Sequence, residues 1–223
     1  MISLLKILYT TITASALLLT TATSFAAESD LCIPFKDAAI DKSLIARMLK
    51  AADNQHLYRI KSDTSKMGFC VDSTIGLVRG EFKNFNGGIA LEGDNSQTMV
   101  TIDVGSLDTN QSFIESLLKG DDFFSVDEYP SLIFVSSEFL WLSDKRAVIK
   151  GNLSMRGVTK EVAFYVDIIE LDADLGDADT ILVKATTTVQ RSEFGMESLS
   201  SMVNDKVNLC MSVEAERYRN PAA

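Results

Sequence analysis

The sequence predicts an all-β protein of about eight antiparallel strands, closed as a sandwich or a barrel, with two helical additions. From residue 57 onward, apolar and polar residues alternate in several separate stretches, which is the period of a half-buried strand. Turn signals such as Asn86-Gly87-Gly88 and Asn204-Asp205 separate these stretches at short intervals. Residues 37–52 are the one long stretch with helical spacing, and it precedes the strands.

The first 26 residues are typical of a secretory signal peptide. Lys6 supplies a positive charge, and the run from 7 to 19 is almost wholly apolar. Ser24-Phe25-Ala26 offers small residues at the two positions that a signal peptidase reads. A membrane anchor is the alternative, but the run is shorter than the roughly 20 residues that span a bilayer. We therefore expect export to the periplasm, with cleavage after Ala26 or Ala27.

The rest of the chain has a length that suits one domain. We expect an N-terminal extension at residues 27–55 and a β-domain at residues 56–223. Within the extension, the 37–52 stretch predicts an amphipathic helix because its apolar residues recur at helical spacing and its polar residues lie opposite. These apolar residues are Leu44, Ile45, Met48 and Leu49.

A second helical stretch, residues 111–119, interrupts the strand series. It carries two apolar rows at i,i+4 spacing, and it runs directly into Asp121-Asp122-Phe123-Phe124. We interpret residues 111–124 as an apolar insertion that lies over one end of the β-structure. The two rows are Phe113 with Leu117 and Ile114 with Leu118.

The sequence offers little for catalysis, for metal binding or for nucleic acid. It has one histidine, His56, so neither a Ser-His or Cys-His pair nor a Cys/His zinc site is expected. The aspartates at 171–180 lack the glycine and the glutamate of an EF-hand calcium loop. A formal net charge of -10 argues against nucleic acid and anionic membrane surfaces. We expect no metal and no cofactor.

The apolar content suggests either an ordinary packed core or a ligand. The chain has twelve phenylalanines, most of them at inward strand positions or in the insertion. An eight-stranded barrel is about the size at which the interior either fills with side chains or holds one small ligand. A packed core would suit a protein-interaction module. A lipid-acting enzyme that uses Asp121 and Asp122 is a further alternative.

Five segments in a fixed order give the sequence a resemblance to the YceI family of periplasmic polyisoprenoid-binding proteins, from about residue 57 to about residue 216. The family resemblance implies an extended, lipocalin-like, eight-stranded antiparallel barrel that holds an isoprenoid chain and has no enzyme activity. The expected ligand is therefore an isoprenoid lipid of quinone or prenyl phosphate type, or another long-chain lipid. A carrier of this kind is expected to contact a membrane or membrane proteins transiently. The segments are LVRGEFKNFNGG (77–88), VTIDVGSLDT (100–109), LLKGDDFFSVDEYPSLIFVSS (117–137), GNLSMRGVTKEVAF (151–164) and QRSEFGM (190–196).

Carried onto this chain, the resemblance implies a pore lined by inward strand residues, with the insertion at its mouth. We infer which side chains point inward from their alternate positions along each strand. A register shift of one residue would turn every inward side chain of that strand to the outer face. Arg191 is expected to meet a lipid head group, and Phe113, Leu117, Phe123 and Phe124 to close or line the mouth. The expected pore residues are Phe69, Val71, Phe82, Val100, Ile102, Leu132, Phe134, Leu153, Met155, Phe164 and Val166.

The same barrel suggests a pairing for the three cysteines. Export permits a disulfide, and an odd count leaves one thiol over. Parity predicts that Cys70 and Cys210 point outward, and the first and last strands of a closed barrel are neighbours. The barrel therefore allows a Cys70–Cys210 bond, and Cys32 is the alternative partner for either cysteine; the sequence does not choose between these pairs.

The run Leu132-Ile133-Phe134-Val135 is apolar at both parities. Leu132 and Phe134 are assigned to the pore, which leaves Ile133 and Val135 on the outer face. Because that outer pair is too apolar for a wet surface, we expect the 37–52 helix to cover it.

Overall fold

The computed structural model describes residues 42–171, 174 and 178–219, and the predicted signal peptide and Cys32 lie outside this part of the chain. Within it are helices α1 (Lys42–Asp53) and α2 (Ser112–Lys119) and single 3-10 turns such as η4 (Arg191–Phe194). The strands are β1 (Leu57–Ile60), β2 (Lys66–Ser73), β3 (Gly76–Phe82), β4 (Phe85–Ala90), β5 (Gln97–Asp103), β6 (Leu107–Asp108), β7 (Ser131–Ser143), β8 (Arg146–Met155), β9 (Val158–Leu171), β10 (Thr180–Gln190) and β11 (Val203–Arg217).

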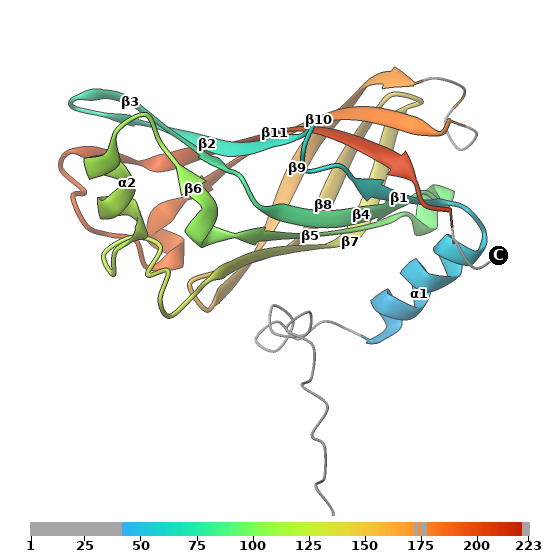
Figure 1. The fold of residues 1–223 in the computed structure, drawn as a ribbon, viewed down its shortest axis with the longest axis horizontal. Helices are drawn as coiled ribbons and strands as arrows, with labels where there is room; N and C mark the ends of the chain where they lie inside the picture. Colours follow the sequence, from blue (N-terminus) through green and yellow to red (C-terminus); the bar gives the residue numbers. More distant parts are fainter. Residues whose placement is uncertain (1–41, 172–173, 175–177, 220–223) are drawn as a thin grey trace, which may run out of the picture. The chain divides into compact units, whose positions relative to one another are not determined.

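Eight of these strands form a closed antiparallel barrel in the order β1-β4-β5-β7-β8-β9-β10-β11, and β11 pairs back to β1 (Figure 1). The last residues of β11 pair with β1, whereas its earlier residues, 203–212, pair with β2. Strands β3 and β6 follow β2 and lengthen this side of the wall. The predicted all-β, eight-stranded antiparallel barrel is confirmed.

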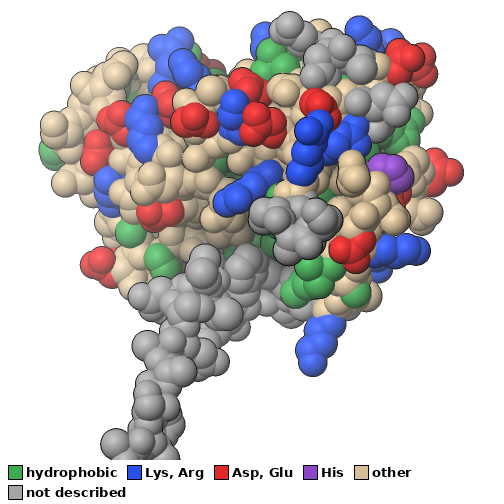
Figure 2. Space-filling view, turned by 45° about the vertical axis from the view of Figure 1, so that its right-hand side comes forward, with side chains coloured by type: hydrophobic (Ala, Val, Ile, Leu, Met, Phe, Trp, Pro, Cys, Tyr) green, Lys and Arg blue, Asp and Glu red, His purple; other side chains and the backbone are tan. Residues whose placement is uncertain are grey.

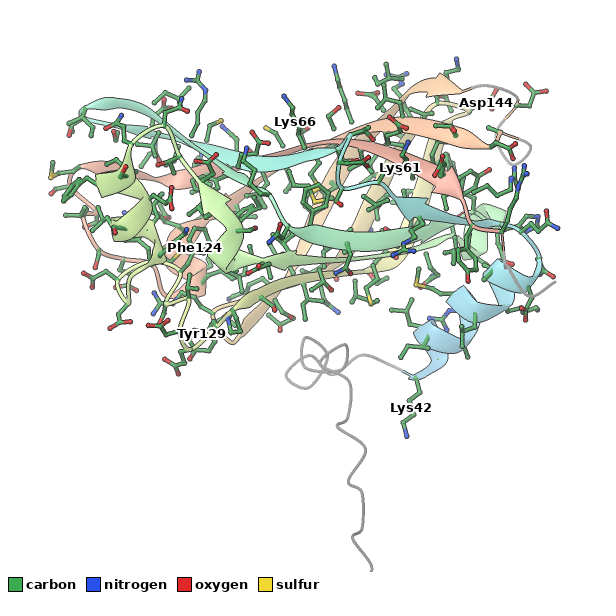
Figure 3. All side chains as sticks on the ribbon, in the orientation of Figure 1. Lys42, Lys61, Lys66, Phe124, Tyr129 and Asp144 are labelled. Atoms are coloured by element: carbon green, nitrogen blue, oxygen red, sulfur yellow. The ribbon has the colours of Figure 1, made fainter. Side chains whose placement is uncertain are left out.

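The barrel has two different ends. Helix α2, the β2–β3 turn and η4 lie at one end, which we call the α2 end, and β1 with the C-terminal part of β11 lies at the other, which we call the β1 end (Figure 1). In Figure 3, Phe124 marks the α2 end and Asp144 marks the opposite side. Lys66 lies between the two ends. No helix in the described part of the chain is long and apolar enough to cross a membrane.

The β8–β9 hairpin shows how local sequence fixes the inner face. Arg156 and Gly157 both have positive φ, at 51° and 70°, which is the type I′ geometry that two-residue hairpins favour. The turn sets the register at Met155 opposite Val158, and buried and more exposed residues then alternate along β8. This alternation confirms the parity by which Leu153 and Met155 were assigned to the interior.

Helix α1 packs on the barrel with a narrower face than the sequence predicts. Leu44 and Ala51 are buried, whereas Ile45 and Leu49 are 46% and 62% exposed, so only part of the predicted apolar row is packed. The main strand contacts of α1 are with β1 and β4. Ile133 is buried on the outer face of β7, and its cover by this helix stays a prediction.

Candidate ligand-binding site

The barrel encloses an apolar cavity of about 150 Å³, lined by residues from ten strands together with Leu118 of α2 and the segments around Phe123 and Met196. Among the described lining residues, Thr98 and Arg191 are the ones with polar side chains. Thr98 donates its hydroxyl proton to the carbonyl oxygen of Gly88 at 3.0 Å, so this group is satisfied within the wall. A cavity with so few polar groups stays dry.

Most of the residues expected at the pore lie around this cavity. Leu132 and Phe134 line it while Ile133 does not, which agrees with the parity assigned to β7. Whether any of these residues contacts a ligand stays a prediction. The expected residues that line the cavity are Phe69, Val71, Phe82, Val100, Ile102, Phe123, Phe124, Leu132, Phe134, Leu153, Met155, Phe164, Val166 and Arg191.

Sixteen further lining residues were not proposed from the sequence. Strands β10 and β11 contribute a large share of them, although both show the alternation from which the other strands were assigned. The parity signal was therefore available for these two strands. It was absent for Leu118 and Met196, which a helix and a turn carry into the interior. The added residues are Ile60, Met67, Gly68, Ile89, Thr98, Leu118, Ile149, Val183, Ala185, Val189, Met196, Val203, Val207, Leu209, Met211 and Val213.

A cluster of phenylalanine rings fills the α2 end of the cavity. The ring of Phe124 lies with its centroid 5.9 Å from those of both Phe69 and Phe82. Phe123 and Phe124 are buried, and the backbone N–H groups of these two residues donate to the carbonyls of Gly120 and Leu118, which fixes the turn after α2. The two phenylalanines therefore close this end, as the apolar insertion predicted.

Phe113 and Leu117 do not line the cavity. Phe113 is 76% exposed, and Leu117 is half-buried and packs against the core without reaching the cavity. The reason is helical geometry: Ile114, Leu117 and Leu118 occupy the inward side at i, i+3 and i+4, so a residue one position earlier projects away from it. The assignment of Phe113 to the mouth lining was wrong.

Arg191 has a structural environment of its own. Its guanidinium donates to the backbone carbonyls of Asn204, Met196, Ser198 and Val203. The side chain is 4% exposed, and its charged carbon lies 6.0 Å from the centroid of the Phe123 ring. These bonds hold together the loop at 196–204, so the expected head-group contact is not the main use of this side chain.

A polar cluster closes the β1 end instead. The hydroxyl of Tyr58 donates to the carbonyl of Ala178 at 2.7 Å, and Arg217 donates to that hydroxyl at 2.9 Å. Arg217 also pairs with Asp179 at 3.3 Å, and its guanidinium lies over the Tyr58 ring. Tyr58 is fully buried. This end is closed by hydrogen bonds, whereas the α2 end is closed mainly by apolar side chains.

The cysteines point outward as parity predicts, but they are not bonded. Both Cys70 and Cys210 are free thiols, so the possible Cys70–Cys210 disulfide is not formed, and the alternative partner Cys32 lies outside the described residues. The register explains this result, because Cys70 lies opposite Asn208 and Cys210 lies opposite Gly68. The two cysteines are thus diagonal neighbours and not directly opposite residues. Diagonal pairs across a sheet lie roughly 7–8 Å apart, farther than most disulfides span.

A family model described as the YceI-like domain matches residues 58–215 of this chain. Among curated relatives, a UPF0312 protein of Pseudomonas aeruginosa is 30% identical over 141 residues, which is 62% of this chain and 73% of that protein. A UPF0312 protein of Pseudomonas putida is 28% identical over 145 residues, 64% of this chain and 75% of that protein.

Solved structures share the fold. BcnA of Burkholderia cenocepacia superposes with a TM-score of 0.63 at 21% identity, covering 70% of this chain and 98% of that chain. A polyisoprenoid binding domain from Saccharophagus degradans, implicated in plant cell wall breakdown, gives 0.57 at 16% identity, covering 72% and 98%. Since the YceI-like model spans well over half of the sequence and the eight-stranded barrel is present, this chain belongs to the YceI-like family.

Proposed function

We propose that this protein is a periplasmic carrier or reservoir that holds the tail of an isoprenoid lipid inside its barrel. The observation that carries the proposal is the apolar cavity within a closed strand wall. Each CH2 group that leaves water contributes about 0.8 kcal/mol, so a long hydrocarbon tail binds such a cavity without any catalytic group. The Saccharophagus degradans domain, named as a polyisoprenoid binder, supports the same class of ligand.

We further propose that the ligand carries a head group of the quinone or prenyl phosphate type, and that this head group stays at the α2 end. The cavity offers it the positive charge of Arg191, which faces Phe123 while its N–H groups donate to four backbone carbonyls, and little other polarity. At the β1 end the polar groups of Tyr58 and Arg217 are already engaged with one another. The periplasmic location is inferred from the N-terminal 26 residues.

Mass spectrometry tests the proposal directly. Protein purified from the soluble fraction of membrane-containing cells is expected to show, under native conditions, an added mass that organic solvent releases as an isoprenoid lipid. Added polyprenol, prenyl phosphate and quinone would then rank the head groups. A bare polypeptide mass, together with no uptake of any added prenyl lipid, would exclude the carrier function.

A pair of variants on β10 ties binding to the cavity. Ala185 lines the cavity and Thr186 is exposed on the outer face, so Ala185→Trp fills the interior and Thr186→Trp does not. We expect Ala185→Trp to lose bound lipid and Thr186→Trp to keep it. Equal lipid content in two folded variants would place the ligand outside the barrel.

The proposed role is binding without turnover. Asp121 and Asp122, the residues on which the enzyme alternative depends, are exposed and do not line the cavity. The carboxylate of Asp121 accepts a bond from the hydroxyl of Ser125 at 3.4 Å. Lipid incubated with the protein is expected to return chemically unchanged. Turnover that disappears in Asp121→Asn or Asp122→Asn, with lipid binding kept, would favour the enzyme.

A further inference from the structure

Large apolar side chains are exposed on three segments at the α2 end. Phe113 projects from α2, Ile75 lies in the β2–β3 turn with Leu77 just after it on β3, and Leu199 and Met202 lie in the loop before β11. Their exposed fractions are 76%, 70%, 44%, 42% and 45%. We call these five residues the apolar rim. An exposed apolar group of this kind marks an interaction surface more often than a single exposed leucine does.

The fold places the three segments at one end of the barrel, and two of them are in direct contact. The N–H of Thr74 donates to the carbonyl of Met202 at 2.8 Å, and Ser73 pairs with Val203, so the β2–β3 turn and the 199–202 loop are adjacent. Helix α2 lies at the same end of the barrel (Figure 1). By contrast, the face in Figure 2, which turns the opposite end of the barrel forward, shows basic and acidic side chains interspersed.

The apolar rim lies at the end of the barrel that apolar side chains close. Phe123, Phe124 and Met196 line the cavity at this end. Rotating these three side chains breaks no hydrogen bond of their own, and Arg191 can keep its bonds to the 196–204 backbone. Opening the β1 end, by contrast, requires the loss of the Tyr58–Ala178 and Tyr58–Arg217 hydrogen bonds. At the α2 end, a lipid tail that left a bilayer would pass from one apolar environment to another.

The charges near the apolar rim indicate which kind of lipid surface it would bind. Residues 72–79, 108–128 and 193–204 carry nine acidic and two basic side chains, and Arg156, which donates to the carbonyl of Phe123, adds one more basic group at this end. Asp72, Asp122 and Glu197 are exposed among them. Such a surface is repelled by anionic lipid. It is compatible with zwitterionic phospholipid, whose outermost group is an ammonium ion that a carboxylate can meet.

We propose that the apolar rim is a docking surface for a membrane of zwitterionic phospholipid, and that lipid enters and leaves the cavity through it. This inference rests on the proposed lipid-carrier function, since a lipid ligand gives the surface its purpose. Docking itself, however, is measured without any bound ligand. A failure to dock would therefore contradict the docking proposal alone, because the lipid content of the purified protein tests the carrier function separately.

The fluorescence of the single tryptophan, Trp141, reports on a part of the barrel away from the α2 end. This residue lies on β7 outside the rim and donates its ring N–H to the carbonyl of Gly93 at 3.3 Å. A second reporter is made by Phe113→Trp in a Trp141→Phe background. With vesicles of phosphatidylethanolamine and phosphatidylcholine, we expect the reporter at position 113 to shift to the blue and to be quenched by brominated lipid. Trp141 in the unmodified protein should respond little.

Matched substitutions then test the rim. Phe113→Ser with Ile75→Ser is expected to lower the vesicle partition coefficient at least tenfold, because these are the most exposed members of the rim. Leu142→Ser with Leu49→Ser removes two apolar side chains elsewhere, each 62% exposed, and should leave the coefficient unchanged. All proteins are recovered from the soluble fraction with the same N-terminus, so the difference reports the rim alone.

Lipid charge gives the final comparison. Vesicles with 40% phosphatidylglycerol should bind the protein more weakly at low salt, and added salt should restore part of the binding by screening repulsion. Binding only to anionic vesicles, equal loss in both double variants, or quenching of Trp141 in place of the reporter at position 113 would overturn the proposal. So would the absence of binding to any vesicle, which would leave a protein as the partner of this face.

Discussion

Phe69 on β2 lies directly opposite Gly80 on β3, and its ring occupies the space that a side chain at residue 80 would need. A Cβ atom there would lie 2.6 Å from Cε1 and Cζ of the ring and 2.8 Å from Cδ1 of Leu107. The same ring contacts those of Phe82 and Phe124, with centroids 6.0 and 5.9 Å away. The absence of a side chain at Gly80 is therefore what seats the phenylalanine cluster at the α2 end of the cavity.

We expect Gly80→Ala to destabilise the protein by about 1–3 kcal/mol, because the added methyl group overpacks the wall and displaces the ring of Phe69. Urea unfolding followed by circular dichroism measures the change. Phe69→Leu removes the ring atoms that clash, so the alanine should cost clearly less in that background. A cost that is the same in both backgrounds would show that the ring does not set the requirement for glycine.

Arg191→Met tests whether this arginine acts on the fold or on the ligand. The substitution removes four hydrogen bonds to carbonyls around 196–204 and leaves those oxygens without their partner. We expect a loss of about 3 kcal/mol or more in urea unfolding, because buried unsatisfied groups are costly. Hydrogen exchange should rise first in the 196–204 loop. Unchanged stability with weaker binding of prenyl phosphate would instead give Arg191 a head-group role.

The sequence alone could predict which strand side chains point into the barrel, because this depends only on the alternation of residues within each strand. Alternation assigns Leu132 and Phe134 to one face and Ile133 to the other without knowledge of what each strand pairs with, and the cavity lining agrees. The closed barrel followed from the family resemblance, since eight alternating stretches suit a sandwich equally well. The exposed position of Phe113 could not be predicted, because two apolar rows on a short helix leave the choice of face to its neighbours.

Features that depend on register or on distant backbone were also beyond the sequence. The diagonal offset of Cys70 and Cys210 follows from the pairing of β2 with β11, and a shift of two residues would have placed them opposite each other. The carbonyls that hold Arg191 come from a loop several residues later in the chain. Neither relationship leaves a periodic signal, because each depends on the folded path of a turn.

The carboxylate of Asp205 gives a prediction about the stability of the fold at acidic pH. The N–H and hydroxyl of Ser192 donate to its carboxylate at 2.9 Å each, and these bonds, led by the backbone one, hold the pKa of Asp205 below its ordinary value of 3.8. A lowered pKa means that ionised Asp205 stabilises the fold. This contribution is complete above the ordinary pKa and is lost as the pH falls through the lower folded value.

We therefore expect Asp205→Asn to be less stable than the unmodified protein at pH 7, and the difference to narrow as the pH falls below about 4. Urea unfolding of the two proteins at pH 7, 5 and 3 measures it. The comparison removes the effect of Glu115, Asp179 and Glu214, whose pKa values are also lowered by their partners, because both proteins contain them. A difference that grows in acid would contradict the assignment.

The free thiol of Cys210 gives a prediction for reactivity. Burial raises the pKa of Cys210 above its ordinary value of 9.0, and the neighbouring Cys70 thiol raises it further. Since the thiolate is the nucleophile, Cys210 should react slowly with iodoacetamide at neutral pH and reach its full rate only above pH 9. Mass spectrometry of the modified peptide, in a Cys32→Ser background, follows the rate at each pH. Cys70→Ala should move the midpoint down. Rapid alkylation at pH 7, or a Cys70–Cys210 bond in protein purified without reductant, would contradict a free thiol of raised pKa.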